Sequence, residues 1–203
     1  SIASEGSFGP HPAMSYLPCG RELVLLLDRR DEQEFVVVGE DLTVETNFRC
    51  ETVQSGEEVE AFLQQMGYPS HAVVVRTLGG EVLKGITRCQ ELRPAIDRAL
   101  QQDGIVMLET DMRAMHNPTR MQSIARATED LVSKLQQLCP QCGAPGFVAI
   151  ARLPGLPCEW CGQPTSLTRS IRTRCQCCQF TQDSLFPDGM QTADPMHCAF
   201  CNP

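Results

Sequence analysis

The sequence contains no long apolar run. No stretch approaches the roughly 20 consecutive apolar residues that a membrane-spanning helix needs, and the chain opens at Ser1 without the apolar leader of a secreted protein. These absences argue against a membrane partner and favour a reducing, cytoplasmic location. Because the chain begins with serine rather than methionine, we expect a further segment upstream of it.

Basic residues are also scarce. The chain has 17 Lys and Arg against 25 Asp and Glu, a formal net charge of −8. The residues after Leu138 carry four basic and four acidic side chains, so all the excess acidity lies before them. Arg169, Arg172 and Arg174 form the one local basic cluster, which a solvated strand face would explain. A chain with this charge lacks the positive surface that binding to a nucleic-acid backbone requires, so nucleic acid is not an expected partner.

The first two thirds of the chain alternate short apolar runs with amphipathic segments, in a chain of 203 residues that is 42% hydrophobic. We predict strands at 23–27, 35–38, 72–75 and 105–108, and helices at 57–66, 94–100 and 118–138. The first two strands flank a polar turn at 28–33, which is typical of a hairpin. Alternating strands and helices predict an α/β domain over residues 1–138, with a mixed sheet flanked by helices.

Helix boundaries are marked by capping residues. Ser55 precedes the first predicted helix and Gly67 follows it. Asn117 stands directly before Pro118, which places an N-cap ahead of a proline in the first helical position of the longest helix. That helix should end at about Leu138, next to the first cysteine of the tail, with little flexible linker between the two parts.

The last third of the chain contains four C-x-x-C pairs: Cys139 and Cys142, Cys158 and Cys161, Cys175 and Cys178, Cys198 and Cys201. Two intervening residues let a tight turn aim both sulfurs at one ion, and eight thiols are what two tetrahedral zinc sites require. Residues 139–203 are therefore predicted to form a double zinc-ribbon domain with two structural zinc ions, each held by four cysteines. Disulfides, redox dithiols and an iron–sulfur cluster are the alternatives.

Spacing alone does not decide which pairs share an ion. We favour sequential pairing, the first pair with the second and the third with the fourth, because residues 147–151 resemble a strand that leads to the second pair. A cross-braced arrangement, the first pair with the third and the second with the fourth, stays open. Cys177 lies between two ligands and is interpreted as a spare thiol that could replace a neighbour. With four cysteines around each ion no position remains for an activated water, so any reaction must take place elsewhere.

A polar segment joins the last predicted strand of the body to the long helix. Loops at strand ends and helix N-termini are common anion sites in α/β folds. In this segment Glu109 and Asp111 could hold Mg²⁺, while Arg113, His116 and Arg120 could bind phosphate or carboxylate. The alternative is a structural ion-pair network that fastens the loop.

Two further polar segments lie nearer the N-terminus. In the string ASEGSFGPHP, two glycines allow close backbone approach to a ligand, Ser4 and Ser7 offer hydroxyls, and Glu5 supplies a carboxylate. An ordinary loop is the alternative interpretation of this string. Residues 45–48, ETNF, are interpreted as a solvated turn.

These strings and the tail resemble an uncharacterised bacterial family, a domain of unknown function. Its recurring elements are ASEGSFGPHP, ETNF, ETDMRA followed by NPTRM, and paired zinc knuckles ending in CNP, which correspond here to residues 3–12, 45–48, 109–121 and 139–203. The resemblance covers essentially the whole chain. It implies a metal-binding tail and an additional N-terminal segment before this serine, and it implies no settled activity.

Residues 2–7 are also similar to an element of the inosine/xanthosine triphosphate pyrophosphatases, in which a carboxylate helps to hold Mg²⁺ near the phosphates of a nucleotide. This remoter similarity implies that Glu5 is a metal ligand or base, with Arg113, His116 and Arg120 as phosphate contacts.

The leading hypothesis is a cytoplasmic zinc-binding protein whose body binds a phosphorylated small molecule and hydrolyses it with Mg²⁺. The residues assigned to this site are Glu5, Asp111 and His116 as catalytic groups, and Ser4, Ser7, Arg113, Asn117 and Arg120 as substrate contacts. The rival hypothesis is a non-enzymatic adaptor whose zinc ribbons dock protein or nucleic acid, with Trp160, Phe180 and Phe200 as candidate contacts. The oligomeric state stays open.

Overall fold

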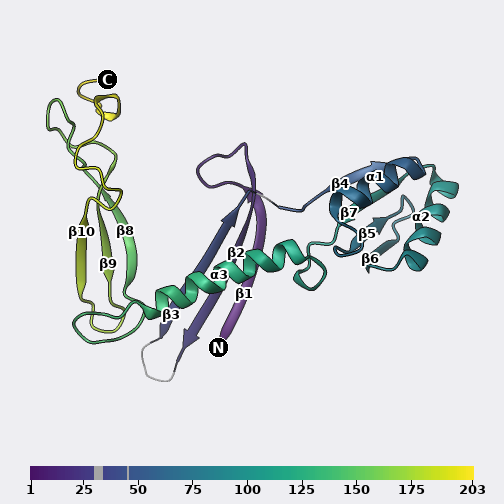
Figure 1. Cartoon of the computed structure of the whole chain (residues 1–203), viewed down its shortest axis with the longest axis horizontal. Coiled ribbons are helices and arrows are strands. Elements are labelled where there is room, and N and C mark those ends of the chain that lie inside the picture. The colour runs from purple at the N-terminus through teal and green to yellow at the C-terminus, as the bar shows by residue number, and fades with distance from the viewer. Residues whose placement is uncertain (30–33, 45) are drawn as a thin grey trace. The chain divides into compact units, whose positions relative to one another are not determined.

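The computed structural model describes residues 1–29, 34–44 and 46–203. Within these residues, three α-helices and ten strands form three separate sheets (Figure 1). The chain divides into two compact units: residues 4–24 with 40–128, and residues 1–3, 25–39 and 129–203. The division between units runs through the long helix, and the predicted domain boundary at residue 138 stays a prediction.

The first sheet has three strands in the order β1 (Ile2–Pro10), β2 (Pro18–Asp28) and β3 (Phe35–Thr43). The apolar runs predicted as strands lie in β2 and β3. The segment that contains ASEGSFGP, for which an ordinary loop was one interpretation, is strand β1 for most of its length. Residues 30–33 of the predicted turn at 28–33 lie outside the described residues, and so does Glu45 of the predicted solvated turn at 45–48.

The second sheet has four strands in the order β4 (Cys50–Val53), β7 (Val106–Thr110), β5 (Val73–Arg76) and β6 (Val82–Ile86). All three of its pairings are antiparallel. The strands that the sequence predicts for one mixed sheet are therefore divided between two sheets.

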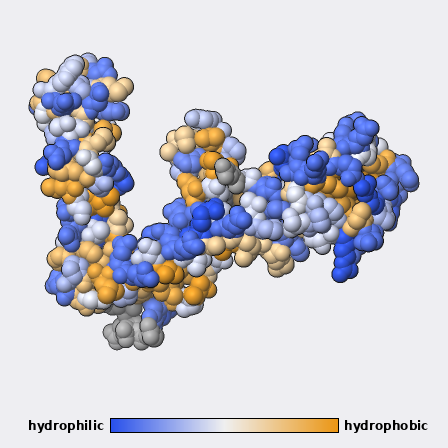
Figure 2. Space-filling view, viewed as in Figure 1, coloured by the Kyte–Doolittle hydropathy of each residue, from blue (hydrophilic) through white to orange (hydrophobic). Residues whose placement is uncertain are grey.

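Helices α1 (Gly56–Met66) and α2 (Cys89–Asp103) pack on the four-stranded sheet. One hydrophobic cluster joins them to the strands; it consists of Val53, Val59, Phe62, Leu63, Met66, Val73, Val75, Ile86, Leu92, Ile96, Ala99, Val106 and Leu108. Because successive strand residues point to opposite faces, Val74 and Arg76 lie on the face away from this cluster. The surface around α1 and α2 is largely hydrophilic (Figure 2), as expected for helices that bury one face.

The helix caps agree with the sequence. The Ser55 hydroxyl accepts a hydrogen bond from the amide of Glu58 at 3.3 Å, and Gly67 ends α1 with a φ of 83°. Helix α2 begins at Cys89, earlier than the predicted start at Pro94, because the buried residue Leu92 already belongs to its apolar face. Helix α3 (Pro118–Gln136) has the predicted start.

The third sheet is an antiparallel meander of β8 (Val148–Pro154), β9 (Thr168–Arg174) and β10 (Thr181–Leu185), with β9 in the centre. The basic cluster of the sequence lies on or beside β9, and Arg172 pairs across the strands with Asp183 at 2.7 Å. Across the described ranges of the chain, no α-helix combines the length and apolar character needed to cross a membrane.

Candidate metal centres and sheet cleft

The meander decides where the four C-x-x-C pairs meet. The first pair precedes β8, the second lies between β8 and β9, the third lies between β9 and β10, and the fourth follows β10. Because neighbouring strands run in opposite directions, odd-numbered pairs gather at one end of the sheet and even-numbered pairs at the other.

Two sets of four thiols result. One consists of Cys139, Cys142, Cys175 and Cys178, and the other of Cys158, Cys161, Cys198 and Cys201; within each set all four sulfurs lie within 4.8 Å of one another. The predicted sequential pairing is therefore wrong, and the cross-braced arrangement is the one observed. The strand recognised at 147–151 does lead to the second pair, but β9 then returns the chain to the first pair before the third begins.

The sulfur separations fit a single ion in each set. Sulfurs from different pairs lie 3.7 and 3.6 Å apart in the first set and 3.9 and 3.6 Å apart in the second. A tetrahedron with zinc–sulfur bonds of about 2.3 Å has edges of about 3.8 Å, whereas a disulfide would bring two sulfurs to about 2.05 Å. All eight cysteines are free thiols, so the geometry is that of ligands and not of disulfides.

Each pair is held by a tight backbone turn. In the first pair the amide of Gly143 donates to the carbonyl of Cys139 at 2.8 Å, and in the second Gly162 donates to Cys158 at 2.9 Å. Both glycines have positive φ, 73° and 69°, a conformation that glycine adopts without a steric penalty. In the third pair Gln179 takes the same conformation, with a φ of 62°, without help from glycine.

The electrostatics of the clustered thiols favour a cation. Backbone hydrogen bonds from Cys201 and Phe200 lower the pKa of Cys198 to about 7. The amide of Phe180 would lower the pKa of Cys178, but burial and the three neighbouring sulfurs raise it to about 12. In the set that contains Cys198, the neighbouring Cys161 and burial raise the pKa of Cys201 to about 12, because within one set each thiolate opposes ionisation of the next. A divalent ion at the centre would stabilise all four thiolates.

Other tail residues stay outside the two sets. Cys177 is exposed and belongs to neither, as its interpretation as a spare thiol predicts. Phe180 stacks on Phe147 with ring centroids 5.9 Å apart. Trp160 and Phe200, by contrast, are 77% and 75% exposed; they occupy the same position in the two pairs that form the second set.

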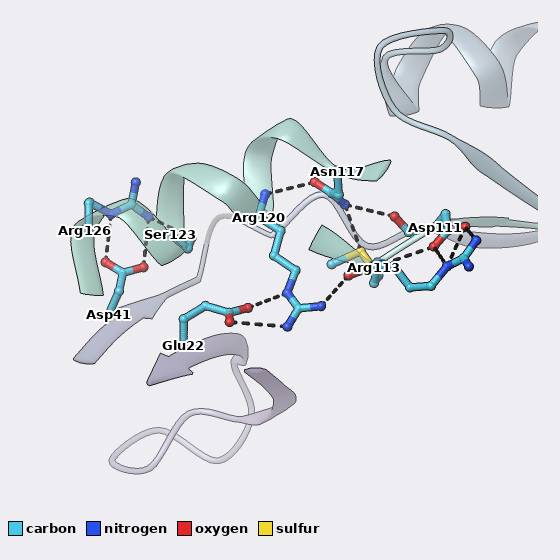
Figure 3. A network of polar contacts seen from close by, with 9 residues as sticks. Glu22, Asp41, Asp111, Arg113, Asn117, Arg120, Ser123 and Arg126 are labelled. Carbon is cyan, nitrogen blue, oxygen red and sulfur yellow. Dashed lines mark hydrogen bonds and ion pairs between the residues drawn. The ribbon is translucent and has the colours of Figure 1, made fainter. Parts of the chain in front are cut away.

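Residues 4–24 and 40–128 form the unit that is called the α/β unit from here on. In it, Asp111 follows β7 (Figure 3) and is buried. Its carboxylate accepts hydrogen bonds from the side chain of Arg113, the shortest at 2.6 Å, and from the Arg113 amide at 3.1 Å. Burial by itself would raise the pKa of Asp111, but these contacts outweigh it and hold the pKa below its ordinary value of 3.8. Asp111 is thus already paired with a cation.

Arg120 takes part in a second network. Its Nε donates to Glu22 on β2 at 2.6 Å and its Nη1 to the carbonyl of Met112 at 2.6 Å (Figure 3). The centroid of the Phe8 ring lies 5.6 Å from the guanidinium carbon. Gly6 packs so closely on this ion pair that a Cβ there would meet both partners. Glu22 was not among the residues predicted from the sequence; its signal is a lone carboxylate near the start of the apolar strand β2.

Asn117 joins the two networks. Its Oδ1 accepts from the amide of Arg120 at 2.9 Å, which is the predicted N-cap of α3. Its Nδ2 contacts the carbonyl of Asp111 at 3.4 Å and the sulfur of Met112 at 3.2 Å. Asn117 is buried, so this side chain ties the loop together from inside.

The other predicted site residues lie apart. Ser4, Glu5 and Ser7 are exposed on β1, and because Gly6 faces the Glu22 ion pair, its neighbours Glu5 and Ser7 point to the opposite side of the strand. His116 is half-buried beside Gly85 and Arg113. The cleft that Asp111 lines includes neither Glu5 nor His116 in its lining.

A cleft of about 470 Å³ lies on the face of the four-stranded sheet away from the hydrophobic cluster. Its lining consists of Phe8, Phe48, Val74, Arg76, Lys84, Glu109, Thr110, Asp111, Met112 and Arg113. In its floor the Nε of Arg76 donates to Glu109 at 2.7 Å. Arg76 and Lys84 were not among the residues predicted from the sequence. A register shift in the pairing of β5 with β6 interrupts the simple alternation between Lys84 and Ile86.

Two interleaved sets of four cysteines, in a chain that also holds an α/β unit with a charged cleft, define a candidate metal-binding protein of two units. A family model described as Domain of unknown function (DUF6671) matches residues 1–203. The chain belongs to this family, which confirms the predicted uncharacterised family. No match was found among curated proteins or among solved structures, and the similarity to pyrophosphatases stays a prediction.

Proposed function

We propose that this chain is a cytoplasmic zinc protein: two structural Zn²⁺ ions brace its tail, and its α/β unit binds a phosphorylated small molecule. The observation that carries the zinc part is the separation of 3.6 to 3.9 Å between sulfurs of paired knuckles. Zinc is the ion that all-thiolate tetrahedral sites commonly take, and four protein ligands leave no open position for chemistry.

The phosphate-binding part is supported by the charges around the cleft. Arg76, Lys84 and Arg113 line it together with the carboxylates Glu109 and Asp111. Each carboxylate already accepts from a guanidinium, so its role in this arrangement is to orient an arginine. The arginines keep further N–H groups for a ligand.

Mg²⁺-dependent hydrolysis is the finer form of this proposal. Asp111 would have to leave Arg113 before it could bind Mg²⁺, and neither Glu5 nor His116 lines the cleft with it. The contacts therefore favour binding over hydrolysis. The test is a panel of nucleotides with Mg²⁺, assayed for release of phosphate or pyrophosphate. Hydrolysis by the native chain that is lost in Asp111→Asn would support this proposal. Absence of hydrolysis by the zinc-loaded native chain would exclude it.

The zinc part is tested by elemental analysis of chain purified without added metal, combined with X-ray absorption at the zinc edge. Two zinc ions per chain, each with four sulfur neighbours, are expected. A substoichiometric zinc content, or iron in its place, would overturn the assignment.

An adaptor role is the second candidate function, favoured by the exposure of Trp160 and Phe200. Two exposed aromatic rings on turns fixed by one ion would form a rigid contact pair. Trp160 is the one tryptophan of the chain, so its fluorescence reports directly on this surface. Quenching by single-stranded RNA or DNA that weakens with salt would support a nucleic-acid adaptor; unchanged emission would exclude these partners.

A further inference from the structure

We infer that the cleft on the four-stranded sheet is built for a phosphate monoester carried on a flat aromatic ring, the chemistry of a mononucleotide. This inference rests on the proposed function, in which the α/β unit binds a phosphorylated small molecule, and it names the class of that molecule. The cleft has a cationic part, which would bind the phosphate, and an aromatic part, which would stack on the ring.

The cationic part consists of Arg76, Lys84 and Arg113. Arg76 donates to Glu109 through Nε, and Arg113 donates to Asp111 through Nε and Nη2. In the described part of the chain, both Nη groups of Arg76 and the Nη1 of Arg113 have no hydrogen-bond acceptor. Guanidinium groups held by carboxylates with N–H groups to spare are well suited to the oxygens of a phosphate.

Lys84 gives this part its net charge. It is exposed on β6, and no ion pair involving it occurs within residues 1–29, 34–44 and 46–203. Three cationic side chains therefore face two carboxylates in the lining, and one positive charge is left without a partner. A bound phosphate would balance that charge.

The aromatic part explains the size of the cleft. A volume of about 470 Å³ falls within the range of sites for small organic ligands and exceeds what a single phosphate fills. The apolar walls come from Phe8, Phe48, Val74 and Met112. Phe8 is held on one side by the guanidinium of Arg120, whereas Phe48 is 54% exposed. A flat ring that covers Phe48 would remove this apolar surface from water.

The test is calorimetric titration of the intact, zinc-loaded chain at low ionic strength without Mg²⁺. Four probes separate the parts of the ligand: inorganic phosphate, ribose 5-phosphate, adenosine and AMP. AMP is expected to bind about tenfold more tightly than ribose 5-phosphate, because stacking of one base on an aromatic ring is worth about a factor of ten. Adenosine, which lacks the phosphate, is expected to bind more weakly than AMP.

Two variants assign these effects to the two parts of the cleft. Lys84→Met should weaken AMP and ribose 5-phosphate alike, by about tenfold, because a charge-assisted hydrogen bond is lost. Phe48→Leu should bring AMP down to the affinity of ribose 5-phosphate and leave the latter unchanged. Arg98→Met is the matched control: it removes one exposed positive charge from α2, which packs on the opposite face of the sheet, and should change neither affinity.

The outcomes distinguish this inference from the proposed function. Equal affinities of AMP and ribose 5-phosphate would overturn the inference that the ligand carries an aromatic ring, but would leave the proposal of phosphate binding in place. Failure of every phosphate compound to bind the zinc-loaded chain would overturn phosphate binding in the α/β unit as well. An equal loss in Lys84→Met and Arg98→Met would show that binding responds only to net charge and would also overturn the inference.

Discussion

The sulfur of Cys139 lies 3.7 Å from the sulfur of Cys178, although 39 positions of sequence separate them. The chain between these two residues includes β8, β9 and the second C-x-x-C pair, whose partners lie beyond β10. Each set therefore takes its two pairs from either side of a pair that belongs to the other set. The two ions therefore depend on the same meander, and each would hold one of its ends.

Cys177 should be dispensable for metal binding. It is exposed and belongs to neither set of sulfurs, although it stands directly between Cys175 and Cys178. We predict that Cys177→Ser retains two zinc ions per chain in elemental analysis. Loss of one ion from this variant would show that Cys177 is a ligand and that the first set is composed differently.

Gly6→Ala should destabilise the α/β unit. The new Cβ would clash with the ion pair of the buried Glu22 and the half-buried Arg120, and such overpacking typically costs about 1–3 kcal/mol. Chemical denaturation of the zinc-loaded chain measures the change. Gly9→Ala is the control, since in the described part of the chain no atom beyond its two chain neighbours lies within 4 Å of a Cβ there; equal stability of the two variants would contradict the close packing at Gly6.

Asn117→Ala should cost about 1–2 kcal/mol in free energy of unfolding, because the amide of Arg120 loses its capping acceptor at the start of α3. Asn117→Ser restores a capping oxygen and should recover part of this loss. The same denaturation measurement compares the two variants. If serine is no better than alanine, the cap does not carry the effect.

Stability should depend on the charge of Asp111 at acid pH. The pKa of this carboxyl is lowered in the folded chain, so its contribution is fully present above its ordinary pKa of 3.8 and is lost as the pH falls towards the folded-state pKa. Asp111→Asn should be less stable than the native chain at pH 7, and the difference should shrink below about pH 4. Acid also releases zinc from thiolates, so the two chains are compared at each pH; a difference that stays constant would contradict the pairing with Arg113.

Features that depend on neighbouring residues could be predicted from the sequence. Ser55, Gly67 and Asn117 act as the caps that their types and positions predict, and the eight cysteines that form the two candidate metal sites were identified because their spacing is itself the signal.

Features that depend on strand order could not be predicted in this way. The cysteine pairing follows from the number of strands between knuckles, and β9 and β10 are too polar to show an apolar pattern. Arg120 meets Glu22 across 98 positions of sequence, a contact that no local pattern signals. The cleft residues Arg76 and Lys84 come from two strands whose register only the folded sheet defines.

The zinc content of two variants, each with four cysteines replaced by serine, tests the interleaved sites most directly. Replacing Cys158, Cys161, Cys198 and Cys201 should leave one zinc ion per chain, held by the first set. Replacing Cys139, Cys142, Cys158 and Cys161 should leave none, although the same number of thiols is lost. The reverse result, no zinc in the first variant and one in the second, would contradict the interleaved arrangement.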